Sequence, residues 1–107
     1  MNSVDEQASE FVIQHSYSLR QLPYSDLYTE NSTQEGEVIE IQAPTDLSPY
    51  EFSFSRCNYD KGIIRVHTLG YKSGAFINTS FKDAFDIYPD GRIREIDRND
   101  EDWCGRT

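Results

Sequence analysis

Residues 81–97 read FKDAFDIYPDGRIREID, and this stretch contains the clearest turn signal in the chain, the tetrapeptide YPDG at residues 88–91. Proline presets φ at the first central turn position, and Gly91 supplies the positive φ that a three-residue hairpin loop with a bulge requires. The segment therefore predicts a β-hairpin in which Tyr88 pairs with Arg92.

This pairing sets the register of the whole hairpin, because side chains alternate between the two faces of a strand. One face is expected to carry an apolar pair and the other a charge pair. The expected opposed residues are Ile87 with Ile93 and Phe85 with Glu95 on one face, and Asp86 with Arg94 and Ala84 with Ile96 on the other.

The chain has 107 residues, enough for a single modest core, so we expect one small acidic domain spanning residues 1–107. Aromatic residues make up 13% of the sequence and leucine is scarce, which favours a sheet over a helical bundle. The predicted fold class is α+β: an antiparallel sheet of four to six strands, in meander and hairpin connections, with an N-terminal helix packed on one face.

Four further strands are expected before the hairpin, at residues 37–42, 50–59, 63–69 and 75–79. Residues 63–69 are partly apolar on both faces, which predicts a central strand. Turns are expected at residues 58–62 and 70–74, and the polar residues 24–36 predict a loop.

Helical spacing of apolar residues predicts an amphipathic helix over residues 4–15, capped by Ser3. This helix would cover the apolar face of the sheet. The alternative is a strand, because residues 11–13 form a cluster of the β-forming type, Phe-Val-Ile. Pro23 is expected to end whatever element precedes it.

The net charge of −9 makes nucleic acid and anionic membranes poor ligands and favours a basic protein partner. Residues 61–82 form a basic island without acids. A solvated strand face is the simpler interpretation of that island.

Few residues suggest catalysis. Arg65 and His67 share one strand face, where they could hold an anion such as phosphate, or His67 could exchange protons with Asp83 or Asp86. The alternative is an exposed strand face without chemistry. Cys57 beside Arg56 is a weaker candidate, as a nucleophile with His67.

His15 is more typical of a packed helical side chain than of a catalyst. The two cysteines, Cys57 and Cys104, have no metal-ligand spacing, and the acidic tail lacks the glycine and spacing of a calcium loop, so neither a metal nor a cofactor is expected. Residues 1–6 lack the pattern of a signal peptide, and no apolar run is long enough to span a membrane, which predicts a cytoplasmic protein with free thiols.

Candidate partner-binding residues come from the acidic tail and from a polar segment rich in tyrosine, because tyrosine and tryptophan give rigid contact area at interfaces. A solvated charge run is the alternative for the tail. The candidates are Asp97, Asp100, Glu101, Asp102, Trp103, Tyr24 and Tyr28.

A small acidic chain without a catalytic constellation is typical of inhibitors and of bacterial immunity proteins, which block a basic, often nucleic-acid-processing, enzyme by charge complementarity. We therefore expect an inhibitor or immunity-type protein. Two alternatives stay open: a small enzyme or anion-binding protein that uses Arg65 and His67, and an accessory subunit that needs its partner for stability.

Overall fold

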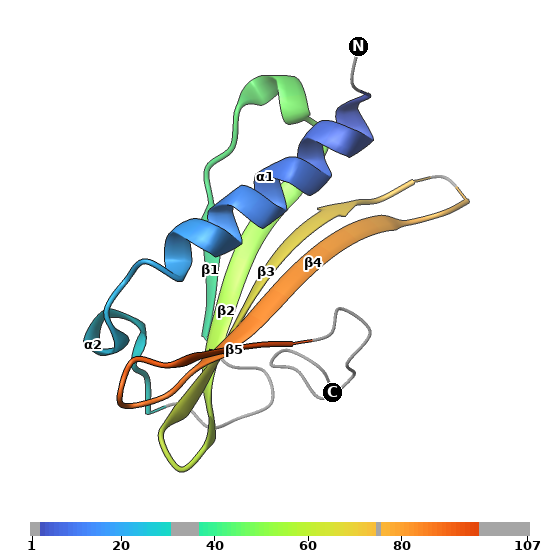
Figure 1. Cartoon of the computed structure of the whole chain (residues 1–107). Helices are drawn as coiled ribbons and strands as arrows, with labels where there is room; N and C mark the ends of the chain where they lie inside the picture. Colours follow the sequence, from blue (N-terminus) through green and yellow to red (C-terminus); the bar gives the residue numbers. More distant parts are fainter. Residues whose placement is uncertain (1–2, 31–36, 75, 97–107) are drawn as a thin grey trace.

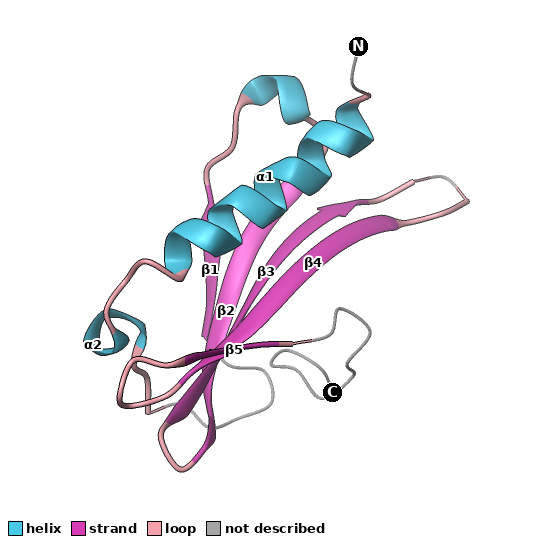
Figure 2. Cartoon of the chain, viewed as in Figure 1, coloured by secondary structure: helices cyan, strands magenta, loops and turns pink. Residues whose placement is uncertain are grey.

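The computed structural model describes residues 3–30, 37–74 and 76–96. One long helix lies across one face of a five-stranded antiparallel sheet with the strand order β1-β2-β3-β4-β5 (Figures 1 and 2). The predicted α+β fold is confirmed, as is the central position of residues 63–69. The elements are α1 (Val4–Leu19), α2 (Tyr24–Leu27), β1 (Glu37–Ile41), the short 3-10 helix η1 (Thr45–Leu47), β2 (Glu51–Asp60), β3 (Ile63–Lys72), β4 (Thr79–Ile87) and β5 (Ile93–Glu95).

The helix α1 begins as predicted and ends later than predicted. The Ser3 side chain accepts a hydrogen bond from the backbone nitrogen of Glu6 at 3.1 Å, which satisfies one of the free amides of the first turn. The helix extends beyond residue 15 because Ser16 and Leu19 continue the row of side chains that is buried against the sheet. Its buried residues are Ala8, Val12, Ser16 and Leu19.

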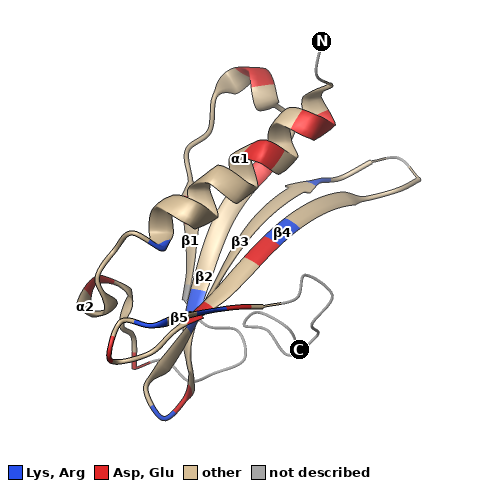
Figure 3. Cartoon of the chain, in the orientation of Figure 1, with Lys and Arg blue, Asp and Glu red and all other residues tan. Residues whose placement is uncertain are grey.

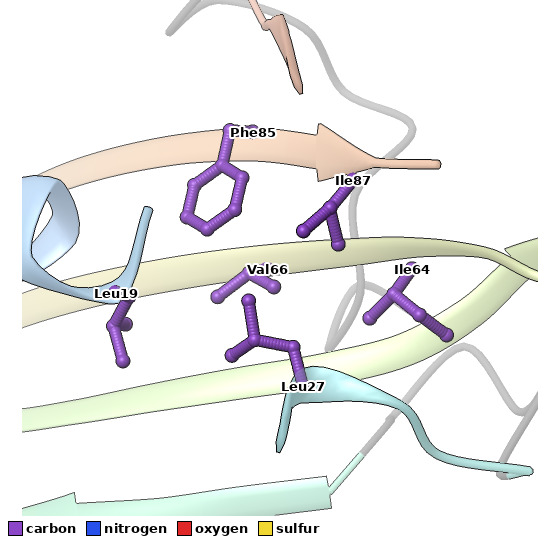
Figure 4. Close-up of a cluster of buried hydrophobic side chains, with 6 residues drawn as sticks. All are labelled: Leu19, Leu27, Ile64, Val66, Phe85 and Ile87. Atoms are coloured by element: carbon purple, nitrogen blue, oxygen red, sulfur yellow. The ribbon is translucent and has the colours of Figure 1, made fainter. Parts of the chain in front are cut away.

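Two clusters of buried side chains form the core between α1 and the sheet. In the first, Leu19 of α1 and Leu27 of α2 lie against Val66 and its neighbours on β3 and β4 (Figure 4). Its members are Leu19, Leu27, Ile64, Val66, Phe85 and Ile87. The second cluster joins the first half of α1 to η1 and β2, and its members are Ala8, Val12, Leu47, Tyr50 and Phe52.

The C-terminal hairpin has the predicted register. The backbone nitrogen of Tyr88 donates to the Arg92 carbonyl at 2.9 Å, and Gly91 has φ 90°. The observed pairs are Phe85 with Glu95, Asp86 with Arg94 and Ile87 with Ile93, and the Ile96 nitrogen donates to the Ala84 carbonyl at 3.4 Å.

The turn predicted at residues 70–74 and the strand predicted at 75–79 are wrong, because β3 continues to Lys72 and β4 begins at Thr79. Gly70 lies inside β3 and is needed there for space. A Cβ at this position would lie 2.9 Å from Val12 Cγ2 and 2.9 Å from Phe52 Cε1. Glycine therefore lets α1 approach the sheet closely, a role that a single glycine in a sequence does not distinguish from a turn.

Candidate functional site

Half of the strand residues point away from α1, to the side of the sheet that we call the far face. Val66 and Phe85 belong to the core under α1, so their neighbours Arg65 and Asp86 point to the opposite side of the sheet. On the three central strands the far face consists of Ser53, Ser55 and Cys57 on β2, Arg65, His67 and Leu69 on β3, and Lys82, Ala84 and Asp86 on β4.

Arg65 forms a buried ion pair on the far face. Its Nε and Nη2 atoms donate to Asp86 Oδ1 and Oδ2 at 2.8 and 3.1 Å, and 1% of each side chain is exposed. Arg94 Nη2 reaches Asp86 Oδ2 at 2.6 Å, and the Arg65 guanidinium lies 3.6 Å from the centre of the Tyr59 ring. The charge of Arg65 is therefore neutralised inside the protein, which does not favour its use in holding a phosphate.

His67 shares the far face with Arg65, as predicted, but only 2% of the residue is exposed. The residues directly opposite it on the neighbouring strands are Ser55 on β2 and Ala84 on β4, and neither is a carboxylate. Burial, and then the positive charges of Arg65 and Lys82, lower the pKa of His67 to about 3. The imidazole is neutral at physiological pH, and this arrangement does not favour proton exchange with a solvent-borne substrate.

Asp83, the other acid considered for His67, lies on the helix-facing side of the sheet. Its Oδ2 atom accepts from Arg20 Nη2 at 3.0 Å, and Arg20 also pairs with Glu95 at 2.7 Å. The same guanidinium donates to Ser16 Oγ at 2.7 Å. Sequence reasoning missed this network, which joins the end of α1 to β4 and β5 and is structural.

The expectation of a free thiol at Cys57 is wrong. Cys57 is disulfide-bonded and buried, and the structure has no free cysteine among its described residues. The residue opposite it on β3 is Arg65 rather than His67. Its sulfur is thus committed to a covalent bond and does not fit the nucleophile considered from the sequence. The second cysteine of the chain, Cys104, lies outside the described residues.

The two candidate tyrosines have different environments. The Tyr24 hydroxyl donates to the Gly62 carbonyl and thereby holds the β2–β3 turn, and its ring lies 5.8 Å from that of Tyr28. Tyr28 is 42% exposed and is accessible to a partner. His15 is packed, with its ring 5.9 Å from Phe54, and burial lowers its pKa. The tail candidates, Asp97, Asp100, Glu101, Asp102 and Trp103, lie outside the described residues.

Acidic residues that are far apart in the sequence lie at the end of the molecule formed by the first half of α1, η1 and the start of β2, here called the acidic end. Figure 3 shows acidic positions of α1 and η1 at this end, and further acidic positions mixed with basic ones at the opposite end. Asp5 of α1 is already held there by Lys72 at 3.1 Å and by the Tyr50 hydroxyl at 2.6 Å. Other carboxylates at this end are exposed and make no ion pair within the described residues. They are Glu10, Glu40, Asp46 and Glu51.

Two hollows lie at the acidic end, and each is lined by two of these carboxylates. The larger, with a volume of about 510 Å³, contains Glu40 and Glu51 and will be called the groove. The smaller, of about 160 Å³, contains Glu10 and Asp46. Sequence reasoning did not select these residues, although the alternation over residues 37–42 already placed Val38 and Glu40 on the same side of a strand.

Among residues 3–30, 37–74 and 76–96, no group of three or more His, Cys, Asp or Glu side chains is arranged to hold a metal ion. None of the described helices is long and apolar enough to cross a membrane.

The fold defines the chain as a small α+β protein, with one helix across an antiparallel five-stranded meander. The chain matches no protein-family model, and no curated protein or solved structure is significantly similar to it. Its function must therefore be argued from its own surface.

Proposed function

We propose that this protein is a small acidic protein-binding module that neutralises a basic protein by direct contact, as an inhibitor or immunity-type protein does. The observation that carries the proposal is the acidic end, where four carboxylates without an ion pair in the described residues surround two hollows. Such a surface attracts a positively charged partner over a distance of about 10 Å at moderate salt and disfavours nucleic acid.

Apolar side chains near this end supply the contact area that charge alone does not give. Phe76, in the connection between β3 and β4, is 100% exposed, and Tyr71 at the end of β3 lines the groove. Exposed aromatic residues of this kind are effective anchors when a partner offers a dry pocket. The tail candidates and Tyr28 remain part of the proposed partner surface.

The alternative function, an enzyme or anion-binding protein built on Arg65 and His67, has less support. Both side chains are buried, Arg65 is paired with Asp86, and the pKa of His67 is far below neutrality. A ligand would have to displace Asp86 to reach the guanidinium, at the cost of leaving a buried carboxylate with a weaker set of partners.

The cytoplasmic location predicted from the sequence rested partly on free thiols, and Cys57 does not have one. Disulfides persist in oxidising compartments and are rare in the reducing cytoplasm. An oxidising compartment is therefore the more consistent place for the proposed encounter.

The test is capture of the partner from the native host with the tagged full-length chain, followed by identification and by kinetics on a sensor surface. We expect a basic protein whose association rate falls steeply as salt is raised, and whose own activity is lost when the complex forms. A partner that is acidic, or whose association does not respond to salt, would contradict the proposal. The tagged chain with Glu40→Gln, Asp46→Asn and Glu51→Gln serves as the control for capture by charge at the acidic end.

A further inference from the structure

The strand β1 is one edge of the described sheet, because it pairs with β2 alone (Figure 1). Val38 and Ile39 are 65% and 39% exposed, which is unusual for apolar residues at consecutive positions of a strand. An exposed edge strand presents a row of backbone amides and carbonyls to which another extended chain can pair.

The groove lies on the far face next to this edge. Across the strands, Glu40 of β1 is opposite Ser53 of β2, and Ser53 is opposite Leu69 of β3. The short serine side chain leaves a depression between its two larger neighbours. Two residues before Ser53 on β2, Glu51 lies opposite Tyr71 of β3. This pair brings a second carboxylate and an aromatic ring to the same hollow.

We propose that an extended segment of the basic partner pairs along the outer edge of β1 and places a lysine or arginine side chain in the groove. This inference rests on the proposed function and specifies how the basic partner is held. Every second side chain of an added strand projects onto the far face, level with Val38 and Glu40. The groove is thus within reach of a segment that is paired by its backbone.

The chemistry of the groove suits a long cationic side chain. The aliphatic stem of lysine or arginine can cover Val38 and Leu69, while the charged head meets the carboxylates of Glu40 and Glu51. The face of the Tyr71 ring adds a favourable site for a cation. An acidic segment would instead be repelled by both carboxylates, and an apolar one would bury them without a partner.

The first experiment uses a short fluorescein-labelled peptide of alternating lysine and valine and measures its fluorescence anisotropy with the full-length protein. We expect saturable binding that the double variant Glu40→Gln/Glu51→Gln weakens by about tenfold or more. The matched control, Asp26→Asn/Asp60→Asn, removes the same charge from exposed positions in α2 and at the end of β2, away from the groove, and should bind like the parent. Melting curves followed by circular dichroism check that both variants fold.

The second experiment tests the backbone pairing. Two versions of the peptide carry N-methyl groups on one or the other alternate set of backbone amides. We expect one set to abolish binding and the other to leave it intact, because only every second amide of an added strand faces the edge. A slip by one residue cannot rescue the blocked peptide, since it would place valine over the groove.

The inference is overturned if the lysine–valine peptide does not bind saturably, if both methylated peptides bind like the parent peptide, or if the groove variant and the matched control lose affinity equally. It is also overturned if a captured basic partner shows the expected salt dependence and binds Glu40→Gln/Glu51→Gln unchanged. That last result would leave the proposed function standing, whereas a partner that is not basic would remove the proposed function itself.

Discussion

Arg65 and Asp86 lie opposite each other on β3 and β4 and form a two-point ion pair from which water is almost fully excluded. Removal of one member breaks this ion pair while the other charge stays buried, which typically costs about 3–5 kcal/mol. We expect Asp86→Ala to lower the free energy of unfolding by that amount in urea titrations.

Two further variants test this explanation. Lys72→Met removes a partly exposed ion pair with Asp5 and should cost about 1 kcal/mol or less. The double variant Arg65→Met/Asp86→Leu removes both buried charges and should recover much of the stability lost in Asp86→Ala. A double variant as unstable as the single one would mean that the charges themselves are required.

Gly70 gives a prediction about the contact between α1 and the sheet. Gly70→Ala would place a methyl group 2.9 Å from both Val12 and Phe52, so we expect a loss of about 1–3 kcal/mol in the free energy of unfolding. Val12→Ala removes one of the two obstructing groups. The combined variant should therefore be more stable than the sum of the two single losses predicts, as measured in a double-mutant cycle. If the two losses of stability are simply additive, the Val12 side chain makes no steric contact with a methyl group at position 70.

Gly91 gives a prediction about the hairpin turn. At φ 90° a β-branched residue is strained, so Gly91→Val should cost about 1–2 kcal/mol, seen as a lower melting temperature. No atom lies within 4 Å of the position that a Cβ would occupy, so the cost is conformational rather than a clash. Gly91→Asn should cost less, because asparagine tolerates positive φ. Equal melting temperatures for the parent and Gly91→Val would contradict a positive φ at this position of the turn.

His67 gives a prediction about pH. Its pKa is 6.5 in the unfolded chain and about 3 in the folded protein, so the folded state binds the proton less readily. The resulting stability is fully present above pH 6.5 and is lost as pH falls towards 3, by roughly 1 kcal/mol per pH unit within that window. We expect His67→Gln to show a correspondingly flatter decline when urea midpoints are compared between pH 6.5 and 4. Parallel declines would mean that the imidazole is not the group responsible.

The acidic tail gives a prediction about binding kinetics. Neutralising Asp100, Glu101 and Asp102 to Asn, Gln and Asn should slow association with the captured partner and flatten its salt dependence, because in the proposed complex these charges would steer the encounter. Trp103→Ala should instead raise the dissociation rate. If the ring is an anchor in a dry pocket, the loss of binding free energy should be roughly 2 kcal/mol. Surface plasmon resonance at two salt concentrations separates the effects. Parent-like kinetics in both variants would place the interface elsewhere.

The register of the hairpin could be predicted in detail because it depends on residues that are close together in the sequence. Pro89 and Gly91 determine the turn, and the turn determines which residues of the two strands meet. The central strand was predictable for a similar reason, since both faces of residues 63–69 carry apolar side chains, Ile63 and Leu69 on one and Ile64 and Val66 on the other. The later end of α1 was not predicted, because Ser16 is polar and interrupts an apolar stripe that continues at Leu19.

The far face and the acidic end could not be predicted in the same way, because they depend on contacts between distant segments. Alternation placed Arg65 and His67 on one face, but the sequence alone does not show whether that face is buried or exposed to solvent. Burial is explained only by the fold, which places Asp86 opposite Arg65. Glu10, Glu40, Asp46 and Glu51 come from a helix, two strands and a short 3-10 helix, and only the fold brings them to the same end. The sequence predicts Gly70 as part of a turn because its close contact with Val12 of α1 is visible only in the folded structure.

The strands at the two edges of the described sheet, β1 and β5, differ in length and in charge. The edge at β5 is only three residues long, and two of these residues, Arg94 and Glu95, are charged, which discourages pairing with another chain. The edge at β1 is longer and carries exposed Val38 and Ile39. The proposed strand addition would lengthen the sheet at β1, whereas the three-residue β5, which pairs with only Phe85, Asp86 and Ile87 of β4, offers no site of the same length.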